Sequence, residues 1–271
     1  ADLWWMSRKY PAGGILEDAS NAWCSMPKPI FIAHAGGGSL CKYSNSKEAI
    51  ADSIARGYKI IEIDVDLTSD CIPVLSHRFR PNNEVVFDYR PSLSEFLSTP
   101  ICGRFTPMTL SQCFTTFKDF DGFWAIDSWG VYRSGMAFDL PRYLVENLLE
   151  GQVRNVIYLA NSLQEAIELA KSGLFASVHC GLPEDIDTSN GIWQLPYLVR
   201  IYIGAGIRSV TLMDREISDL TKQVVATLRK SGIKVSICGV ETCERARTWI
   251  EVGADCFNTD ALSPHQMRFE K

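Results

Sequence analysis

Residues 60–67 read IIEIDVDL and carry an acidic side chain at every second position. Successive side chains of a strand point to opposite faces, so Glu62, Asp64 and Asp66 share one face and the aliphatic residues share the other. Neighbouring carboxylates on that face are about 6.6–7 Å apart between their Cα atoms. In an apolar interior they cannot all stay ionised without a partner, and hard oxygen ligands suit Mg²⁺ or Ca²⁺. The strand alone indicates either a divalent-cation site or, equally, a solvated face of surface carboxylates.

Two histidines and a further aspartate follow other strand-like runs. His34 lies in FIAHAGGG, His77 in PVLSH and Asp127 in FWAIDSW, and the chain has only four histidines. Barrel enzymes place their catalytic groups at the C-terminal ends of strands. Imidazole has a pKa near neutrality, so one ring can remove a proton while another donates one. A single histidine at such a position is usually structural, but two of them around an acidic pair favour a catalytic site.

The elements that must position these residues alternate regularly. Strand-like runs such as NVIYLA, IRSVTLM and KVSICGV are separated by helical patterns such as SLQEAIELAKSG and ETCERARTWIEVG. This alternation predicts a parallel sheet with crossover helices. About eight strands over roughly 240 residues predict an α/β fold of the (β/α)₈ TIM-barrel class. An open doubly wound sheet is the alternative, because counting strands from sequence can err by one.

We predict a single barrel domain over residues 31–271, with two segments that break the alternation. Residues 1–30 contain three tryptophans and little periodicity, and we expect this N-terminal extension to pack on the barrel or close one end of it. Residues 79–107, after the second or third strand, are polar and punctuated by proline. We interpret them as a small insertion, because long loops in compact domains tend to be lids or binding loops.

Charge and hydropathy exclude several classes of function. The net charge is −5, the pI is about 5.5 and no basic run is present, which argues against a nucleic-acid surface. The longest apolar runs are the size of strands, so no transmembrane segment is predicted. The first residues lack the apolar core of a signal peptide. The alternative that a signal peptide has already been cleaved stays open.

The nine cysteines are scattered, none forms a CxxC pair, and their number is odd. Several lie in apolar strand-like runs such as SVHC and ADCF. This distribution favours buried free thiols in a reducing compartment over a zinc cluster. We therefore predict a cytoplasmic protein.

The stretch IAHAGGG…NSKEAIADSIARGYKIIEIDVDLTSDCIPVLSHR resembles the glycerophosphodiester phosphodiesterase family. The shared features are a His-x-Gly after the first strand, an Asn-centred turn before the first helix, a Glu-x-Asp strand and a PV…H strand. RFTPMTLSQCF and WIEVGADCFNTD are similar to later segments of that family, so the resemblance spans roughly residues 31–260. The same set of residues also resembles that of sphingomyelinase D-like phospholipases and of bacterial phosphatidylinositol-specific phospholipases C. The prediction of the reaction class is therefore better supported than the prediction of the substrate.

The resemblance implies a (β/α)₈ barrel that hydrolyses phosphodiesters with a divalent metal, Mg²⁺ or Ca²⁺. Glu62 and Asp64 would be metal ligands, and Asp127 stands where the family usually has Glu. His34 and His77 would be the general acid and base. Whether water or a hydroxyl of the substrate is the nucleophile stays open.

Four further residues are candidates for binding the substrate. Asn45 matches the Asn of the family's turn and would orient a phosphate oxygen or a ligand, with a helix N-cap as the equal alternative. His179 in SVHC either points into the site or has a core role. Trp129 stands where the family typically has Lys, and would line a site for a larger or more apolar substrate. Arg78 follows the second histidine and would supply a cation to the phosphate.

The sequence also departs from the family's pattern. Ala35 replaces the Arg that typically follows the first histidine, so together with Trp129 two cations expected near the phosphate are absent. Charge-assisted contacts to phosphate are among the stronger polar interactions. Arg78, Arg80 or Lys42 could replace these cations from another loop. The run AGGGS at 35–39 lacks the Lys and the spacing of a P-loop, so we interpret it as a tight turn.

These features predict a metal-dependent phosphodiesterase acting on a small-molecule or lipid-derived phosphodiester, such as a glycerophosphodiester. The alternative is a weak or inactive barrel that binds a phosphorylated ligand or a partner protein, favoured by the missing cations. A third hypothesis is a sugar-converting or isomerase barrel, which would act without any phosphate in its substrate. The oligomeric state stays open.

Overall fold

The computed structural model describes residues 23, 26–77, 79 and 87–266 of the chain. Most of the predicted extension and the start of the predicted insertion lie outside these described residues. Within the extension, the described Trp23 is buried.

The chain divides into two compact units. One unit, here called the site unit, comprises residues 31–156 and 259–271, and the second unit comprises residues 1–30 and 157–258. Every candidate site residue named from the sequence belongs to the site unit, except His179.

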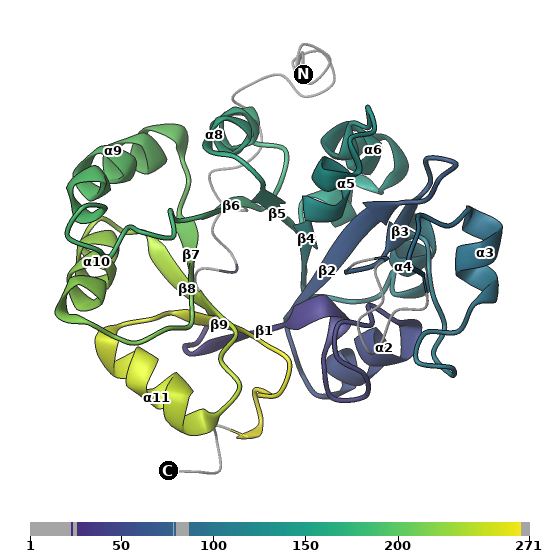
Figure 1. Cartoon of the computed structure of the whole chain (residues 1–271), viewed down its shortest axis with the longest axis horizontal. Coiled ribbons are helices and arrows are strands. Elements are labelled where there is room, and N and C mark those ends of the chain that lie inside the picture. The colour runs from purple at the N-terminus through teal and green to yellow at the C-terminus, as the bar shows by residue number, and fades with distance from the viewer. Residues whose placement is uncertain (1–22, 24–25, 78, 80–86, 267–271) are drawn as a thin grey trace. The chain divides into compact units, whose positions relative to one another are not determined.

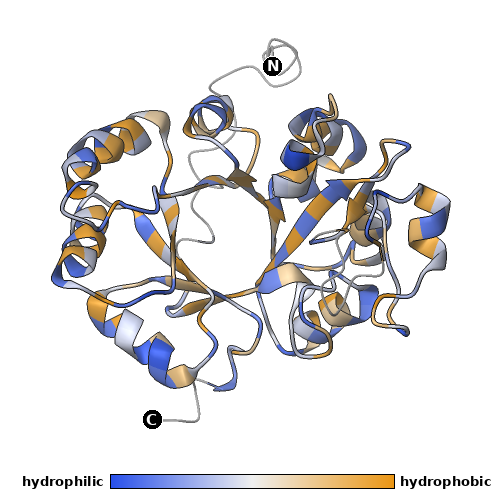
Figure 2. Cartoon of the chain, viewed as in Figure 1, coloured by the Kyte–Doolittle hydropathy of each residue, from blue (hydrophilic) through white to orange (hydrophobic). Residues whose placement is uncertain are grey.

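In the site unit, β2 (Ile60–Leu67) is the central strand (Figure 1). It runs parallel to β1 (Ile30–Ala33) on one side and to β4 (Phe123–Asp127) on the other. α2 (Lys47–Ala55) connects β1 to β2 and begins at the N-cap Ser46, whose hydroxyl accepts a hydrogen bond from the Ala49 amide. All eight residues of β2 are buried, although acidic and aliphatic positions alternate along it (Figure 2). The alternative of a solvated face of surface carboxylates is therefore excluded.

The strand that precedes His77 differs from the prediction, because it is not a parallel strand of the barrel. β3 (Pro73–Leu75) is antiparallel to the end of β2, with Val65 opposite Leu75 and Leu67 opposite Pro73. It is the return arm of a hairpin and not one of the parallel strands, because only a short turn separates it from β2, whereas a parallel partner needs a crossover. This direction carries the chain back toward Asp64, whose carbonyl accepts a hydrogen bond from the Ser76 amide at 3.0 Å.

The described part of the predicted insertion packs on this hairpin. α3 (Leu93–Ser98) begins with a capping box formed by Ser92 and Glu95. Its Phe96 forms a buried cluster with Val74, Phe79 and Phe87. The segment thus has its own small apolar core beside β3.

The remaining helices of the site unit lie before and after β4 in the chain. α4 (Leu110–Thr116) precedes β4. α5 (Trp129–Ser134), α6 (Leu140–Asn147) and α7 (Glu150–Val153) follow β4. α5 therefore begins two residues after Asp127.

The second unit repeats a strand–helix alternation with parallel pairing between its successive strands. Its helices α8 and α11 each end at a glycine in the left-handed conformation, Gly173 and Gly253, which stops a helix without steric cost. Its elements are β5 (Val156–Ala160), α8 (Leu163–Ser172), β6 (Ser177–Gly181), a 3₁₀ helix (Ile192–Gln194), α9 (Leu195–Ala205), β7 (Ser209–Met213), α10 (Asp219–Lys230), β8 (Lys234–Cys238), α11 (Cys243–Val252) and β9 (Cys256–Thr259).

The hydrogen-bonded strand order is β1-β9-β8-β7-β6-β5-β4-β2, with β1 also paired to β2 and with β3 attached to β2. A sheet whose first and last parallel strands pair with each other is a closed (β/α)₈ barrel. The predicted fold class is confirmed, and the open doubly wound alternative is excluded.

Two cysteines correct the expectation of free thiols. Cys41 and Cys102 form a disulfide between positions 61 residues apart in sequence. The loop after β1 and the turn before α4 bring them together, and no local sequence signal reveals such a contact. Among the described residues, no helix combines the length and the apolar composition needed to cross a membrane.

Candidate active site

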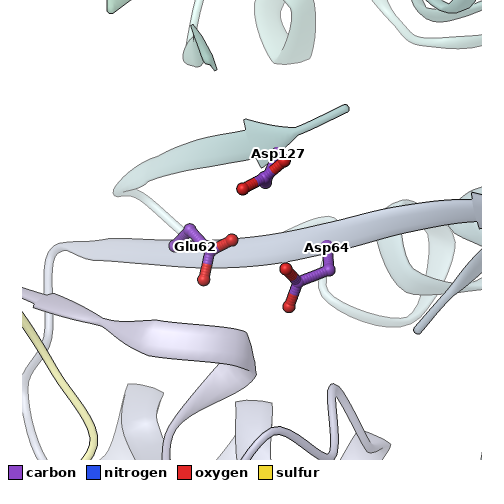
Figure 3. Close-up of side chains that lie close together, drawn as sticks. All are labelled: Glu62, Asp64 and Asp127. Atoms are coloured by element: carbon purple, nitrogen blue, oxygen red, sulfur yellow. The ribbon is translucent and has the colours of Figure 1, made fainter. Parts of the chain in front are cut away.

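Three carboxylates converge in the site unit. Glu62 and Asp64 project from β2, and Asp127 ends β4 (Figure 3). The parallel register places Asp64 directly opposite Asp127. One oxygen of each side chain lies within 4.8 Å of an oxygen of the other two. Two neighbouring strands thus bring together residues that are more than 60 positions apart.

Burial makes this cluster of charges costly. Burial and the nearby Asp64 raise the pKa of Glu62 well above its usual range. Burial likewise raises the pKa of Asp64, against the opposing effects of His34 and Asn45. The pKa of Asp127 rises to about 6, first through burial and then through the charge of Asp64. A divalent cation would remove this cost, and a set of three carboxylates is the hard donor set that Mg²⁺ and Ca²⁺ prefer.

Two groups hold the carboxylates of β2 in place. The Ala35 amide donates to Glu62 Oε2 at 2.6 Å from the 3₁₀ turn His34–Gly36. Asn45 binds Asp64 twice, because its Nδ2 donates to Asp64 Oδ2 at 2.8 Å and its Oδ1 accepts from the Asp64 amide at 3.0 Å. Asn45 is fully buried with a positive φ of 50°, a conformation that Asn tolerates better than most residues. The helix cap is the neighbouring Ser46, so Asn45 positions the carboxylate of Asp64 instead of capping α2.

His34 lies directly after β1, and Asp260 holds its ring. Its Nδ1 is 2.9 Å from Asp260 Oδ1. Burial alone would lower the pKa of His34, but the Asp260 hydrogen bond and the charges of Glu62 and Asp64 outweigh burial and raise this pKa to about 10. Gly38 allows the loop to pass close to Asp260, because a Cβ at Gly38 would lie 2.4 Å from the Cβ of Asp260.

His77 returns to the site on the antiparallel hairpin. The ring centroids of His34 and His77 are 5.7 Å apart and nearly perpendicular. Tyr43 contacts both rings, with centroid distances of 5.3 Å to His34 and 4.8 Å to His77. The three rings form a cluster at the side of the carboxylates.

Asp127 also fixes the helix that follows it. The Trp129 amide donates to Asp127 Oδ1 at 2.7 Å at the start of α5. The Trp129 side chain is exposed and stacks on Tyr132, with centroids 5.4 Å apart. Gly130 is required at the next position, because a Cβ there would lie 2.6 Å from the Val65 carbonyl oxygen.

A cavity of about 230 Å³ lies beside His77. Asp66, the last acidic residue of β2, lies in its wall and accepts a 2.7 Å hydrogen bond from Arg90 Nη1. The lining residues are Asp66, His77, Phe79, Asp88, Tyr89, Arg90, Gly130 and Arg133.

The structure brings together most of the residues that the sequence singled out. Glu62, Asp64, Asp127, His34 and Asn45 form one connected group, and His77 contacts it through the His34 ring.

Other candidates lie elsewhere or stay undescribed. Arg78 and Arg80 lie outside the described residues. His179 lies in the second unit, where its Nδ1 is 2.8 Å from Ser209 Oγ and its Nε2 contacts Thr211 Oγ1. Lys42 lies 3.9 Å from Asp260 Oδ2. The roles predicted for these residues stay predictions.

Sequence reasoning did not identify Tyr43 or Arg133, and it assigned Asp260 no part in the site. Asp260 is 226 positions from His34, and only strand order could have placed it beside the first histidine. No motif identifies Tyr43. Arg133 could have been found by its spacing, since it follows Trp129 by one helical turn.

A family model matches part of the site unit. Residues 34–126, which carry both histidines and Glu62 and Asp64, match the model of the glycerophosphoryl diester phosphodiesterase family. A search of curated proteins finds no match.

Solved structures support the fold over most of the chain. A putative glycerophosphodiester phosphodiesterase from Galdieria sulphuraria aligns with a TM-score of 0.68 at 16% identity, over 89% of this chain and 96% of that one. An Oleispira antarctica phosphodiesterase in complex with the product sn-glycerol-3-phosphate aligns with a TM-score of 0.64 at 17% identity, over 89% and 95%. A glycerophosphodiester phosphodiesterase from Thermotoga maritima aligns with a TM-score of 0.63 at 19% identity, over 87% and 96%.

The family match confirms the resemblance stated from the sequence. Together with the barrel, it classes the protein with the phosphoric diester hydrolases. The family it resembles is that of the glycerophosphoryl diester phosphodiesterases.

Proposed function

We propose that the protein is a metal-dependent phosphodiesterase that hydrolyses a glycerophosphodiester or a lipid-derived phosphodiester. The observation that carries this proposal is the convergence of three buried carboxylate oxygens within 4.8 Å of one another beside two histidine rings. Carboxylates alone indicate a cation, but the two imidazoles add the acid and the base that cleavage of an ester requires.

Glu62, Asp64 and Asp127 would hold the cation. A divalent ion there would neutralise charge on the non-bridging oxygens of the phosphate. The protein's contribution is to keep these ligands in place, through the Ala35 amide on Glu62, Asn45 on Asp64 and the Trp129 amide on Asp127. Such outer contacts orient metal ligands and strengthen binding.

The two histidines would divide the proton transfers. The carboxylate of Asp260 accepts from Nδ1 of His34 and stabilises the imidazolium form, so we assign His34 the donation of a proton to the leaving alkoxide oxygen. His77 then removes the proton from the attacking oxygen, whether that belongs to water or to a hydroxyl of the substrate. Tyr43 packs on both rings and limits their rotation.

The substrate class follows from the family match and from the small cavity beside His77. One solved relative of the fold contains sn-glycerol-3-phosphate as its product. A cavity of about 230 Å³ is smaller than the pockets that hold drug-sized ligands. We therefore favour a diester with a small polar alcohol group at this position.

The test is the turnover of glycerophosphodiesters and of bis(p-nitrophenyl) phosphate by the wild type and by His34→Ala. Each protein is assayed with Mg²⁺, with Ca²⁺ and with a chelator. We expect activity that needs a cation and that falls about 100-fold or more in the variant, the usual range for loss of a general acid. Turnover that neither chelation nor His34→Ala affects would refute the proposal.

A further inference from the structure

The candidate site has a surplus of negative charge that a phosphodiester must overcome. Glu62, Asp64 and Asp127 form the cluster, and Asp260 lies next to it beside His34. A bound divalent ion offsets two of these charges and a protonated His34 ring offsets a third, and the substrate adds another negative charge. Arginine is the residue best suited to a phosphate oxygen, because its planar guanidinium can donate two parallel hydrogen bonds.

Two arginines line the cavity beside His77, and they differ in their contacts. Arg90 Nη1 is 2.7 Å from Asp66 Oδ1 and also donates to the Leu67 carbonyl. Its guanidinium lies 5.4 Å from the Phe79 ring centroid. The guanidinium of Arg90 is therefore already bound to residues of the cavity wall.

Arg133 has no comparable partner among the described residues. It is exposed, and it forms no ion pair or hydrogen bond with another described side chain. It lines the cavity together with Asp66. Burial raises the pKa of Asp66, and the charges of Arg90 and, to a smaller extent, Arg133 oppose that rise. With respect to the part of the chain that the structure describes, Arg133 thus lines the cavity with its donors available.

The helix that carries Arg133 is fixed to Asp127, one of the three clustered carboxylates. α5 begins at Trp129, whose amide binds the Asp127 carboxylate. Gly130 lies against the Val65 carbonyl and the Asp66 side chain without room for a Cβ. Arg133 follows Trp129 by four residues, so the two side chains lie on the same face of the helix. The position of Arg133 is therefore coupled to that of Asp127.

We infer that Arg133 contacts a non-bridging phosphate oxygen of the substrate when the reacting phosphate lies between His77 and the three carboxylates. The inference rests on the proposed function and adds to it the cation that the positions of Ala35 and Trp129 do not supply. It also orients the substrate in the cavity, because the phosphate would lie next to His77 and Arg133.

Kinetics of Arg133→Gln and Arg133→Lys test this contact. The matched control is Arg142→Gln on α6, where an exposed arginine pairs with Glu146 at 2.8 Å away from the cavity lining. We expect Arg133→Gln to lose about 10- to 100-fold in kcat/KM for a glycerophosphodiester, the range for a hydrogen bond to a charged group. Arg133→Lys keeps the charge and should lose less, and Arg142→Gln should match the wild type.

A second measurement separates a missing guanidinium from a folding defect. Arg133→Gly is assayed with and without low millimolar guanidinium ion. We expect the ion to raise the activity of this variant at least fivefold and to leave the activities of the wild type and of Arg142→Gln unchanged. Arg133→Gln within threefold of the wild type, or an absence of rescue in a folded Arg133→Gly, would overturn the inference.

Binding of a product keeps the inference testable if the proposed function fails. Calorimetry measures the affinity of sn-glycerol 3-phosphate for the wild type and for Arg133→Gln. If the wild type turns over no diester, the proposed function is refuted, but at least tenfold weaker binding by the variant would still support Arg133 as a phosphate contact. Equal affinities would overturn it.

Discussion

His34 shows how a single side chain depends on distant parts of the sequence. Its Nδ1 is 2.9 Å from Asp260 Oδ1, and the carboxylates of Glu62 and Asp64 add negative charge around the ring. These groups outweigh the effect of burial and raise the pKa of His34 to about 10. A raised pKa favours the imidazolium form, which a proton donor requires.

Replacing Asp260 with Asn tests this pairing. The amide keeps the shape but loses the charge that stabilises the imidazolium, so the pKa of His34 falls. We expect the alkaline limb of the kcat/KM profile to move to lower pH, with a loss of roughly 10- to 100-fold at pH 8. Asp139→Asn, at the N-cap of α6, is the control. A variant profile that overlays that of the wild type would contradict the assigned role.

Asn45 provides a second test at the level of one residue. Asn45→Gly accepts the positive φ but removes both hydrogen bonds to Asp64. We expect the affinity for Mg²⁺ or Ca²⁺, measured by calorimetry, to fall about 10- to 100-fold, as for other groups that orient metal ligands. Ser44→Ala is the control, because the Ser44 hydroxyl bonds to Ser46 and not to Asp64. Unchanged affinity in Asn45→Gly would show that Asp64 needs no support.

At the scale of elements, α5 connects the cluster of Glu62, Asp64 and Asp127 to the cavity through Gly130. A Cβ at this position would lie 2.6 Å from the Val65 carbonyl oxygen and 2.8 Å from the Asp66 Cβ. Neither atom belongs to a flexible side-chain end, so α5 must move to relieve the clash.

We expect Gly130→Ala to lower the free energy of unfolding by about 1–3 kcal/mol and to weaken cation binding through Asp127. Chemical denaturation and calorimetry measure the two effects. Gly151→Ala in α7, where the new Cβ meets no atom within 4 Å, should be neutral or slightly stabilising. Equal stability of the two variants would mean that α5 is not held by this contact.

The elements also show what can be predicted from the sequence and what cannot. The period of two in IIEIDVDL predicted β2 and the shared face of Glu62 and Asp64, because this pattern is local. The antiparallel course of β3 was not predicted, since a short strand after a turn reads the same in either direction. The contacts of His34 with Asp260 and of Cys41 with Cys102 span 226 and 61 positions. Such pairs follow from strand order and loop paths, which no local pattern contains.

At the scale of the whole molecule, His179 makes stability depend on pH. Burial lowers the pKa of His179 to about 4, and its two ring nitrogens contact Ser209 and Thr211 on β7. The unfolded chain takes up a proton near pH 6.5, whereas the folded chain does so only near pH 4. Stability from this group is therefore complete above pH 6.5 and is lost as the pH falls toward 4.

The expected loss is about 3 kcal/mol of unfolding free energy between pH 7 and pH 4. Urea denaturation at a series of pH values measures it, and His179→Gln should lack this part of the pH dependence. His34 affects stability in a different pH range. Its pKa is raised, so its contribution to stability is lost only as the pH rises toward 10. Identical pH dependence in the wild type and in His179→Gln below pH 6.5 would contradict the assignment of a neutral buried ring.

The most direct measurement is anomalous diffraction from crystals soaked in Mn²⁺, an oxygen-preferring stand-in for Mg²⁺ and Ca²⁺. The account predicts one strong anomalous peak within about 2.0–2.6 Å of carboxylate oxygens of Glu62, Asp64 and Asp127, and its loss in Asp64→Asn crystals. Crystals that show no peak at these oxygens, or a peak that persists unchanged in Asp64→Asn, would contradict a cation-binding centre at this position.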